Sequence, residues 1–265
     1  MPYVDVAKSR IYYESHGPGP EASKSAPALV LLHGVGGNHA SWFHQVTHWR
    51  AHYRVLILDA RGFGNSTDTE QLGQAAFVSD VEAVLKDAGV ERCILIGQSM
   101  GGGTALSFTC RWPERVLALV LADTLFGLTL SAALRESLEA LTATNARLTQ
   151  LERVLGARYP EKHPAMATLY TTLASFNAVN VRTLKGGPPM HSPAELAATG
   201  VPVLFLVGEG DVLFPPSLVH PAQQLVTGSH YVELPGAGHS AYFETPELFN
   251  QAILTWLGKI GVAMG

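Results

Sequence analysis

The stretch that decides the fold runs from Cys93 to Phe108 and has the sequence CILIGQSMGGGTALSF. Its first four residues are apolar and suit a buried strand, and the residues after the three glycines favour a helix. We therefore predict a strand, a sharp turn and a helix. Gly97 and Gly101 lack the Cβ atoms that would collide in so tight a turn, so Ser99 can occupy a strained backbone at its tip.

Residues 97–101 have the pattern G-x-S-x-G, in which a strand-to-helix turn presents a serine hydroxyl as a nucleophile. Five such residues also occur by chance, and a glycine-rich structural turn is the alternative interpretation. The strand before the motif and the helix after it favour the nucleophile. The N-terminus of that helix would place N–H groups beside the Ser99 hydroxyl, where an oxyanion forms in acyl transfer.

The chain has 265 residues, 47% of them hydrophobic, and a net charge of −4. This length suits one large α/β core with an insertion. The charge offers no basic surface for nucleic acid or an anionic membrane, and no apolar run approaches eighteen residues. The start of the chain lacks a basic region before an apolar run. We therefore expect a cytoplasmic protein that binds neither nucleic acid nor membranes.

Cysteine and histidine do not indicate a metal or a disulfide. Cys93 and Cys110 lack the Cys-x-x-Cys spacing and are expected to be reduced, packed thiols. Four histidines follow one another closely, and the steps of four residues would align three of them on one helical face. Without a matching carboxylate or thiol pattern, a polar helix surface is the favoured interpretation. We expect no metal and no cofactor. These histidines are His39, His44, His48 and His52.

Strands and helices alternate along most of the chain. A first hairpin at residues 4–6 and 10–15 precedes a Gly/Pro/Ser-rich loop, 17–27, in which we identify no chemistry. Continuous apolar runs then predict strands buried on both faces of a parallel sheet. Right-handed crossovers would join them. Including the hairpin, the sequence predicts a mostly parallel eight-stranded sheet with helices on both faces. The later predicted strands span residues 28–32, 54–58, 93–96, 116–122, 202–207 and 230–234.

The alternation stops between Thr124 and Met190. Apolar residues at helical spacing predict three helices there and no strand. An all-helical segment inserted after the sixth strand is placed to fold over the strand ends that carry Ser99. We therefore predict a core domain of residues 1–123 and 191–265, and a helical cap of residues 124–190, here named the cap segment. An unrelated packing or interaction domain is the alternative.

Three residues follow predicted strands in the order Ser99, Asp211, His239. A serine hydroxyl needs a base to accept its proton, and the base needs an acid to hold its tautomer. Strand ends converge on one edge of a parallel sheet, so these distant residues can meet. We predict Ser99 as nucleophile, His239 as base and Asp211 as acid. Asp123 and Glu209 are alternative acids, because geometry decides that role.

The oxyanion hole is predicted from two backbone N–H groups. One belongs to Met100, directly after the serine, and the other to Val35 in the loop His33-Gly34-Val35. Gly34 would let the backbone approach the substrate closely. We expect His33 to hydrogen-bond the backbone and fix this turn, with a role as a second base as the alternative.

Five motifs together resemble the α/β-hydrolase superfamily over nearly the whole chain outside the cap segment. Within it the chain is similar to small cytoplasmic enzymes: 3-oxoadipate enol-lactonases, carboxylesterases and cofactor-free haloperoxidases. The resemblance implies an acyl-serine intermediate at Ser99. Serine at the elbow argues against haloalkane dehalogenases and epoxide hydrolases, and Val35 and Ser240 depart from the pattern of meta-cleavage C–C hydrolases. The motifs are His33-Gly34-Val35-Gly36-Gly37, Asp59-x-Arg61-Gly62-x-Gly64-x-Ser66, Gly97-Gln98-Ser99-Met100-Gly101-Gly102, Gly208-x-x-Asp211-x-x-x-Pro215-Pro216 and Gly236-x-Gly238-His239.

The main functional hypothesis is a serine hydrolase that cleaves small carboxylic esters or lactones. Alternatives are a C–C bond or amide hydrolase with the same triad, and a ligand receptor with a slow vestigial triad. The partner would be a small-molecule substrate, and a homo-oligomer is left open. Phe176, Tyr170 and Met166 are candidate substrate-binding residues, with core packing as the alternative. Five arginines of the cap segment could neutralise a carboxylate substrate: Arg135, Arg147, Arg153, Arg158 and Arg182.

Overall fold

The computed structural model describes residues 2–17 and 27–262. Most of the predicted loop 17–27 therefore lies outside the described residues. An eight-stranded sheet has the order β1-β2-β4-β3-β5-β6-β7-β8. β1 and β2 pair antiparallel, as do β2 and β4, and all other neighbours are parallel. The predicted fold class is confirmed. The strands are β1 (Tyr3–Val6), β2 (Ser9–His16), β3 (Ala28–Leu32), β4 (Arg54–Leu58), β5 (Cys93–Gln98), β6 (Val116–Ala122), β7 (Val203–Gly208) and β8 (His230–Leu234).

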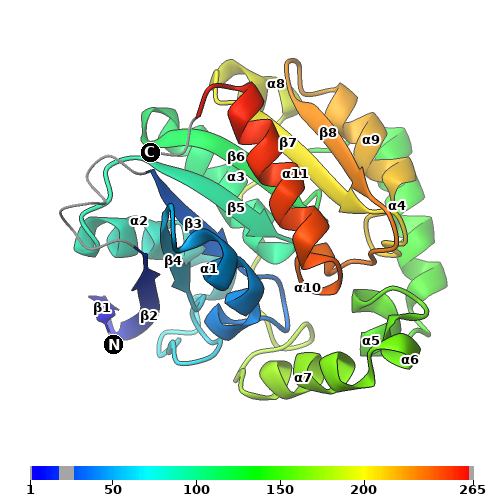
Figure 1. Cartoon of the computed structure of the whole chain (residues 1–265), viewed down its shortest axis with the longest axis horizontal. Coiled ribbons are helices and arrows are strands. Elements are labelled where there is room, and N and C mark those ends of the chain that lie inside the picture. The colour runs from blue at the N-terminus through cyan, green and yellow to red at the C-terminus, as the bar shows by residue number, and fades with distance from the viewer. Residues whose placement is uncertain (1, 18–26, 263–265) are drawn as a thin grey trace.

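Helices cover both faces of the sheet (Figure 1). The α-helices are α1 (Phe43–Trp49), α2 (Phe77–Asp87), α3 (Met100–Arg111), α4 (Ala132–Asn145), α5 (Gln150–Val154), α6 (Tyr159–Lys162), α7 (Pro164–Ser175), α8 (Pro193–Ala198), α9 (Pro216–Gln224), α10 (Ala241–Glu244) and α11 (Pro246–Lys259). The described residues also form the short 3-10 helices η2 (His39–Trp42), η3 (Gly73–Ala76) and η4 (Pro113–Arg115). No helix among the described residues is long and apolar enough to cross a bilayer.

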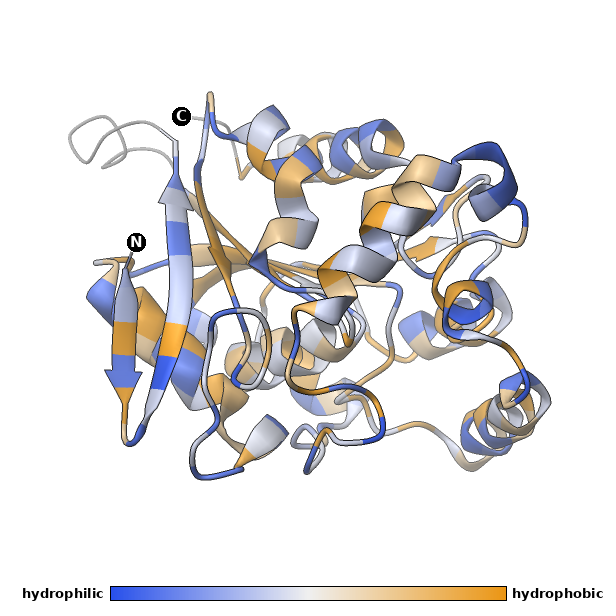
Figure 2. Cartoon of the chain, turned by 90° about the horizontal axis from the view of Figure 1, so that it is seen from below, coloured by the Kyte–Doolittle hydropathy of each residue, from blue (hydrophilic) through white to orange (hydrophobic). Residues whose placement is uncertain are grey.

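Two apolar cores lie on opposite faces of the sheet. Successive residues of β3 belong to opposite cores. Leu29 and Leu31 pack with α1 and α11, whereas Val30 and Leu32 pack with α2, α3 and α9. Because side chains of a strand alternate between faces, a strand covered on both sides is apolar throughout. In Figure 2 the central strands are mostly orange, whereas the helices around them carry both hydrophobic and hydrophilic bands.

The strand register brings the carboxyl ends of the parallel strands to one edge. Leu32 of β3 pairs with Gly97 of β5, and Gln98 of β5 pairs with Ala122 of β6. Ala122 of β6 pairs with Leu206 of β7, and the last parallel pair ends with Gly208 of β7 beside Leu234 of β8. Residues that follow these ends in the chain are therefore neighbours in space, although more than 200 positions separate the first from the last.

The cap segment contains α4, α5, α6 and α7, and no strand is formed by its residues. The sequence predicted three of these helices and missed α6, which is only four residues long. In Figure 1, α5, α6 and α7 lie together at one end of the molecule, next to α10. Leu155 joins the core that contains α11, whereas Leu134 and Leu138 of α4 pack against the opposite core. The division into core and cap domains stays a prediction.

Candidate active site

Ser99 has the strained backbone that the sequence predicts. Its φ is +49° and its ψ is −118°, a conformation that a side-chain-bearing residue rarely adopts. The N–H of Ser99 donates to the carbonyl of Ala122 over 3.0 Å, and the Thr124 hydroxyl donates to the Ser99 carbonyl over 2.9 Å. Both anchors come from the β6 end. They hold the turn in place while α3 begins at Met100.

The glycines of the turn permit this close packing. A Cβ placed on Gly97 would lie 2.6 Å from the Cα of Gly102, and one placed on Gly101 would lie 2.5 Å from the carbonyl carbon of Leu32. Both distances are far below van der Waals contact, and backbone atoms cannot rotate away as a side chain can. The steric argument made from the sequence is confirmed at both positions.

The structure brings the side chains of Ser99, His239 and Asp211 together. The Ser99 hydroxyl donates to Nε2 of His239 over 3.0 Å, and Nδ1–H of His239 donates to Oδ2 of Asp211 over 2.9 Å. Their exposed fractions are 7%, 4% and 2%. A hydrogen-bonded chain from hydroxyl to imidazole to carboxylate, shielded from water, can carry a proton away from the serine.

Asp211 is fixed by its own loop. Its Oδ1 accepts the backbone N–H groups of Leu213 and Phe214 over 2.7 and 3.1 Å, which leaves Oδ2 for His239. Because two amides hold one oxygen, the carboxylate cannot rotate freely. The Phe214 ring lies 6.0 Å from the imidazole, centroid to centroid.

The two alternative acids have other partners. Asp123 is fully buried, and its oxygens accept the N–H groups of Gly208 and Ala241 over 2.8 and 3.2 Å. Burial, together with the nearby Asp211, raises the pKa of Asp123 well above its usual range. Glu209 is exposed and accepts the N–H of Gly236. The contacts with His239 therefore belong to Asp211 and not to these carboxylates.

The residues predicted for the oxyanion hole flank the serine. Met100 begins α3, so its N–H has no acceptor within the helix. Val35 lies inside the turn that the N–H of Gly37 closes on the carbonyl of Gly34. A Cβ on Gly34 would lie 3.0 Å from the Cβ of Ser99, so this loop touches the elbow directly.

His33 supports this loop as a neutral imidazole. Its Nδ1–H donates to the Gly34 carbonyl over 2.8 Å, and its Nε2 accepts the N–H of Ala60 over 3.0 Å. Burial lowers the pKa of His33, which favours the neutral form that these two contacts require. The predicted structural role of His33 is confirmed.

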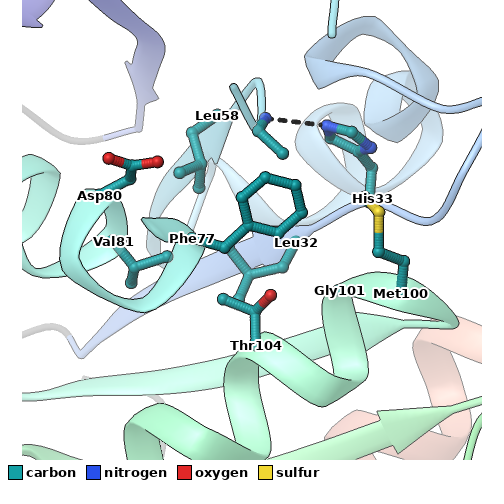
Figure 3. A pocket seen from close by; sticks show the side chains of 10 residues that line it. Leu32, His33, Leu58, Phe77, Asp80, Val81, Met100, Gly101 and Thr104 are labelled. Carbon is teal, nitrogen blue, oxygen red and sulfur yellow. Dashed lines mark hydrogen bonds between the residues drawn. The ribbon is translucent and has the colours of Figure 1, made fainter. Parts of the chain in front are cut away.

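A cavity of about 20 Å³ lies between this loop, α2 and α3, and has room for about one water molecule. Figure 3 shows His33 and Met100 on one side of it, with Asp80 and Thr104 among the other lining residues. Arg61 forms a buried ion pair with Asp80, with Nε 2.7 Å from Oδ2. The cavity therefore lies next to His33, in the loop that is predicted to form part of the oxyanion hole.

The three candidate substrate-binding residues of the cap segment have different surroundings. Tyr170 is 6% exposed, stacks edge-on against Phe243, and its hydroxyl accepts a hydrogen bond from Ser240 over 3.2 Å. Met166 is partly buried against the same core, whereas Phe176 is 66% exposed. Their roles in substrate binding stay predictions. Among the five arginines proposed for a carboxylate substrate, four are exposed and Arg153 is partly buried.

Only two of the three histidines that four-residue steps would align lie in a helix. His39 lies in η2 and binds Asp59 through Nδ1 at 2.9 Å, His44 and His48 lie in α1, and His52 follows the end of that helix. In the described part of the chain, no group of three His, Cys, Asp or Glu side chains is arranged to hold a metal ion.

Sequence reasoning missed two side chains that hold the site together. Gln98, next to the serine, donates from Nε2 to the carbonyl of His239 over 2.8 Å. Asn177 of the cap segment donates to the carbonyl of Gly37 over 3.1 Å and accepts the N–H of Gly64 over 2.9 Å. Each bond spans more than 110 positions of sequence, so no local pattern could reveal it.

Residues 29–252 match the family model described as the alpha/beta hydrolase family. The chain belongs to the α/β-hydrolase family. It is an enzyme of the hydrolase class, and the predicted resemblance is confirmed at the level of the family. The matched range includes Ser99, Asp211 and His239 together with the loop that carries Val35.

Individual members of the family resemble the chain over most of its length. Carboxylesterase YbfK of Bacillus subtilis is 27% identical over 263 residues, which cover 96% of this chain and 86% of that protein. A putative 2-succinyl-6-hydroxy-2,4-cyclohexadiene-1-carboxylate synthase of the same organism is 31% identical, with 91% and 93% covered. The solved thermophilic esterase of Thermogutta terrifontis has a TM-score of 0.79 and 25% identity, with 97% of each chain covered.

Proposed function

We propose that this α/β-hydrolase cleaves small carboxylic esters or lactones through an acyl-serine intermediate. The observation that carries the proposal is the hydrogen-bonded chain from the Ser99 hydroxyl through His239 to Asp211. A serine hydroxyl is a weak nucleophile unless a positioned base accepts its proton. The similarity to carboxylesterase YbfK and to the T. terrifontis esterase supports ester substrates.

The proposed reaction has two acyl transfers. Ser99 Oγ attacks the carbonyl carbon while His239 accepts the hydroxyl proton, and the N–H groups of Met100 and Val35 stabilise the negative oxygen. His239 then gives its proton to the leaving alkoxide oxygen, which departs as an alcohol from an ester or becomes the free hydroxyl of the opened ring of a lactone. A water molecule, deprotonated by His239, attacks the acyl-serine, and His239 then returns this proton to Ser99 Oγ as the carboxylic acid leaves. Asp211 stabilises the imidazolium throughout.

An apolar acyl group suits the surroundings of the proposed oxyanion hole. The side chain of Met100 packs with Phe63 and Phe77, and Val35 lies against the same cluster. Two residues of the cap segment, Val179 and Leu184, join it. Phe63, Phe77 and Met100 are themselves buried, so an acyl chain beside the reacting carbonyl would meet the partly buried Val35, Val179 and Leu184. A charged group there would lose its hydration without a partner.

Hydrolysis of p-nitrophenyl acetate and butyrate tests the proposal. We expect an acyl burst, labelling of Ser99 by a fluorophosphonate, and loss of both in Ser99→Ala. Ser107→Ala is the matched control, because Ser107 is a buried serine of α3 that donates to the Pro189 carbonyl. Turnover that survives Ser99→Ala would refute the mechanism. Panels of amides and diketones test the alternative bond types, and tight ligand binding with almost no turnover would favour a receptor.

A further inference from the structure

A buried carboxylate outside the three-residue chain joins the His239 loop to the cap segment. Glu244, at the end of α10, is 8% exposed. Its Oε1 accepts the backbone N–H groups of Gly238 and Ser240 over 3.0 and 3.2 Å, one on each side of His239. Its Oε2 accepts the N–H of Gly156, between α5 and α6, over 2.6 Å.

We propose that Glu244 is a positioning residue that aligns His239 with Ser99 and ties this alignment to the docking of the cap segment. The proposal rests on the hydrolase mechanism above, in which His239 is the base. One oxygen of the carboxylate accepts hydrogen bonds from the His239 loop, and the other accepts a hydrogen bond from the cap segment. A shift of either partner is therefore transmitted through one rigid group to the other.

The backbone packing at this point supports the link. A Cβ on Gly238 would lie 2.7 Å from the carbonyl carbon of Leu155 and 2.8 Å from the Cα of Gly156. Only a glycine next to His239 lets the cap backbone come this close. The contact between the His239 loop and the cap segment is therefore made by the backbones of Gly238 and Gly156 together with the carboxylate of Glu244.

The other end of the histidine loop is held separately. Gln98 binds the carbonyl of His239, while Glu244 binds the amides before and after it. With the backbone fixed on three sides, the imidazole stays 3.0 Å from the Ser99 hydroxyl and 2.9 Å from Asp211. Loss of the Glu244 contacts would release two of these three anchors.

Protonation of Glu244 would weaken the link, because a protonated oxygen presents O–H to a backbone N–H. Burial raises the pKa of Glu244 to about 7, although the three amides and His239 act in the opposite direction. The other titratable groups that interact with it are Asp123 at the β6 end, Tyr159 of α6, Tyr170 of α7 and Tyr242 of α10. Burial raises the pKa of all three tyrosines, so they stay neutral near pH 7.

The test compares kcat and KM of wild type, Glu244→Gln and Glu247→Gln for p-nitrophenyl butyrate between pH 5.5 and 8.5. Glu247 is the matched control, an exposed glutamate of α11. In Glu244→Gln the carbonyl can accept the two loop amides, but the NH₂ group meets the Gly156 N–H and that bond is lost. A displacement of about 1 Å lowers the rate on the order of a hundredfold. Because Glu244→Gln keeps the two loop contacts and loses only the Gly156 bond, we expect the smaller effect of about a tenfold fall in kcat/KM at pH 8.

The pH dependence separates positioning from a merely structural role. The ratio of wild-type to Glu244→Gln activity should approach one near pH 6, where wild-type Glu244 is protonated, while Glu247→Gln stays at one throughout. A ratio that is constant with pH, or an unchanged Glu244→Gln, overturns the proposal. Wild type without a Ser99-dependent burst would instead refute the hydrolase mechanism.

If Glu244→Gln does not fold, Gly156→Ala disturbs the contact from the cap side, because its Cβ would lie 3.0 Å from Oε2 of Glu244. It should also lower kcat, and unchanged kcat overturns the proposal.

Discussion

Replacing Gly101 with alanine should damage both stability and activity, although alanine is the better helix former. Gly101 lies in α3, and its Cβ would lie 2.5 Å from the carbonyl carbon of Leu32 and 2.8 Å from the carbonyl oxygen of His33. These are backbone atoms at the end of β3, so the strand end must move. Forced overpacking of this kind costs about 1–3 kcal/mol.

Gly258→Ala is the matched control. Gly258 also lies in a helix, α11, but a Cβ there would meet nothing within 4 Å. Both substitutions carry the same intrinsic gain of about 1 kcal/mol in helix propensity. The difference between the two variants therefore isolates the steric clash, and Gly258→Ala should be more stable than Gly101→Ala by about 1–3 kcal/mol.

Urea unfolding measures the loss of stability in Gly101→Ala, and the rate of ester hydrolysis measures the loss of activity. The chain that follows Leu32 carries the N–H of Val35, so a displaced strand end moves the proposed oxyanion hole. Movement by about 1 Å would lower kcat on the order of a hundredfold, while Gly258→Ala keeps wild-type kcat. Equal unfolding free energies and equal rates in the two variants would refute the steric account of the elbow.

Three further predictions concern buried polar groups. Gln98→Ala should cost about 1–3 kcal/mol and lower kcat, because the buried His239 carbonyl loses its donor; unchanged urea unfolding would contradict this. Arg61→Met should cost about 3–5 kcal/mol, since the charge of Asp80 stays buried without its partner, and the double variant with Asp80→Leu should recover most of the loss. An equal loss in the double variant would argue against the ion pair. The third prediction is a pH dependence: the pKa of Glu244 rises from 4.5 to about 7 on folding, so the native state holds this proton more tightly than the unfolded chain. The stabilisation from this tighter proton binding is fully present below pH 4.5 and is lost as pH rises through 7. Between pH 5 and 8 the free energy of unfolding of wild type should therefore fall by on the order of 3 kcal/mol relative to that of Glu244→Gln. A gap between the two unfolding curves that does not change with pH would disprove it.

One helix that the sequence prediction missed has a readable local signal. α8 begins with Ser192, whose hydroxyl accepts the N–H of Glu195 while the Glu195 carboxylate accepts the N–H of Ser192. This capping box, with Pro193 in the first turn, is a pattern that the residue letters alone contain. α6, with four residues, is too short to show a helical periodicity.

Local sequence is sufficient to define the sheet, the elbow and the candidate trio Ser99, Asp211 and His239. Each depends on short-range chemistry: apolar runs for strands buried on both faces, glycines where a Cβ would collide, and polar residues directly after strand ends. The parallel topology then requires those ends to meet. Chain order was enough to place the three residues on one edge of the sheet.

Which groups hold that edge together depends on packing in three dimensions. Asp211 and not Asp123 contacts His239, because two amides of its own loop aim one oxygen at the imidazole, while Gly208 and Ala241 occupy Asp123. The bond from Glu244 to Gly156 joins residues 88 positions apart. Such contacts form between elements that fold from separate stretches of the chain, and packing of this kind leaves no periodic trace in the sequence.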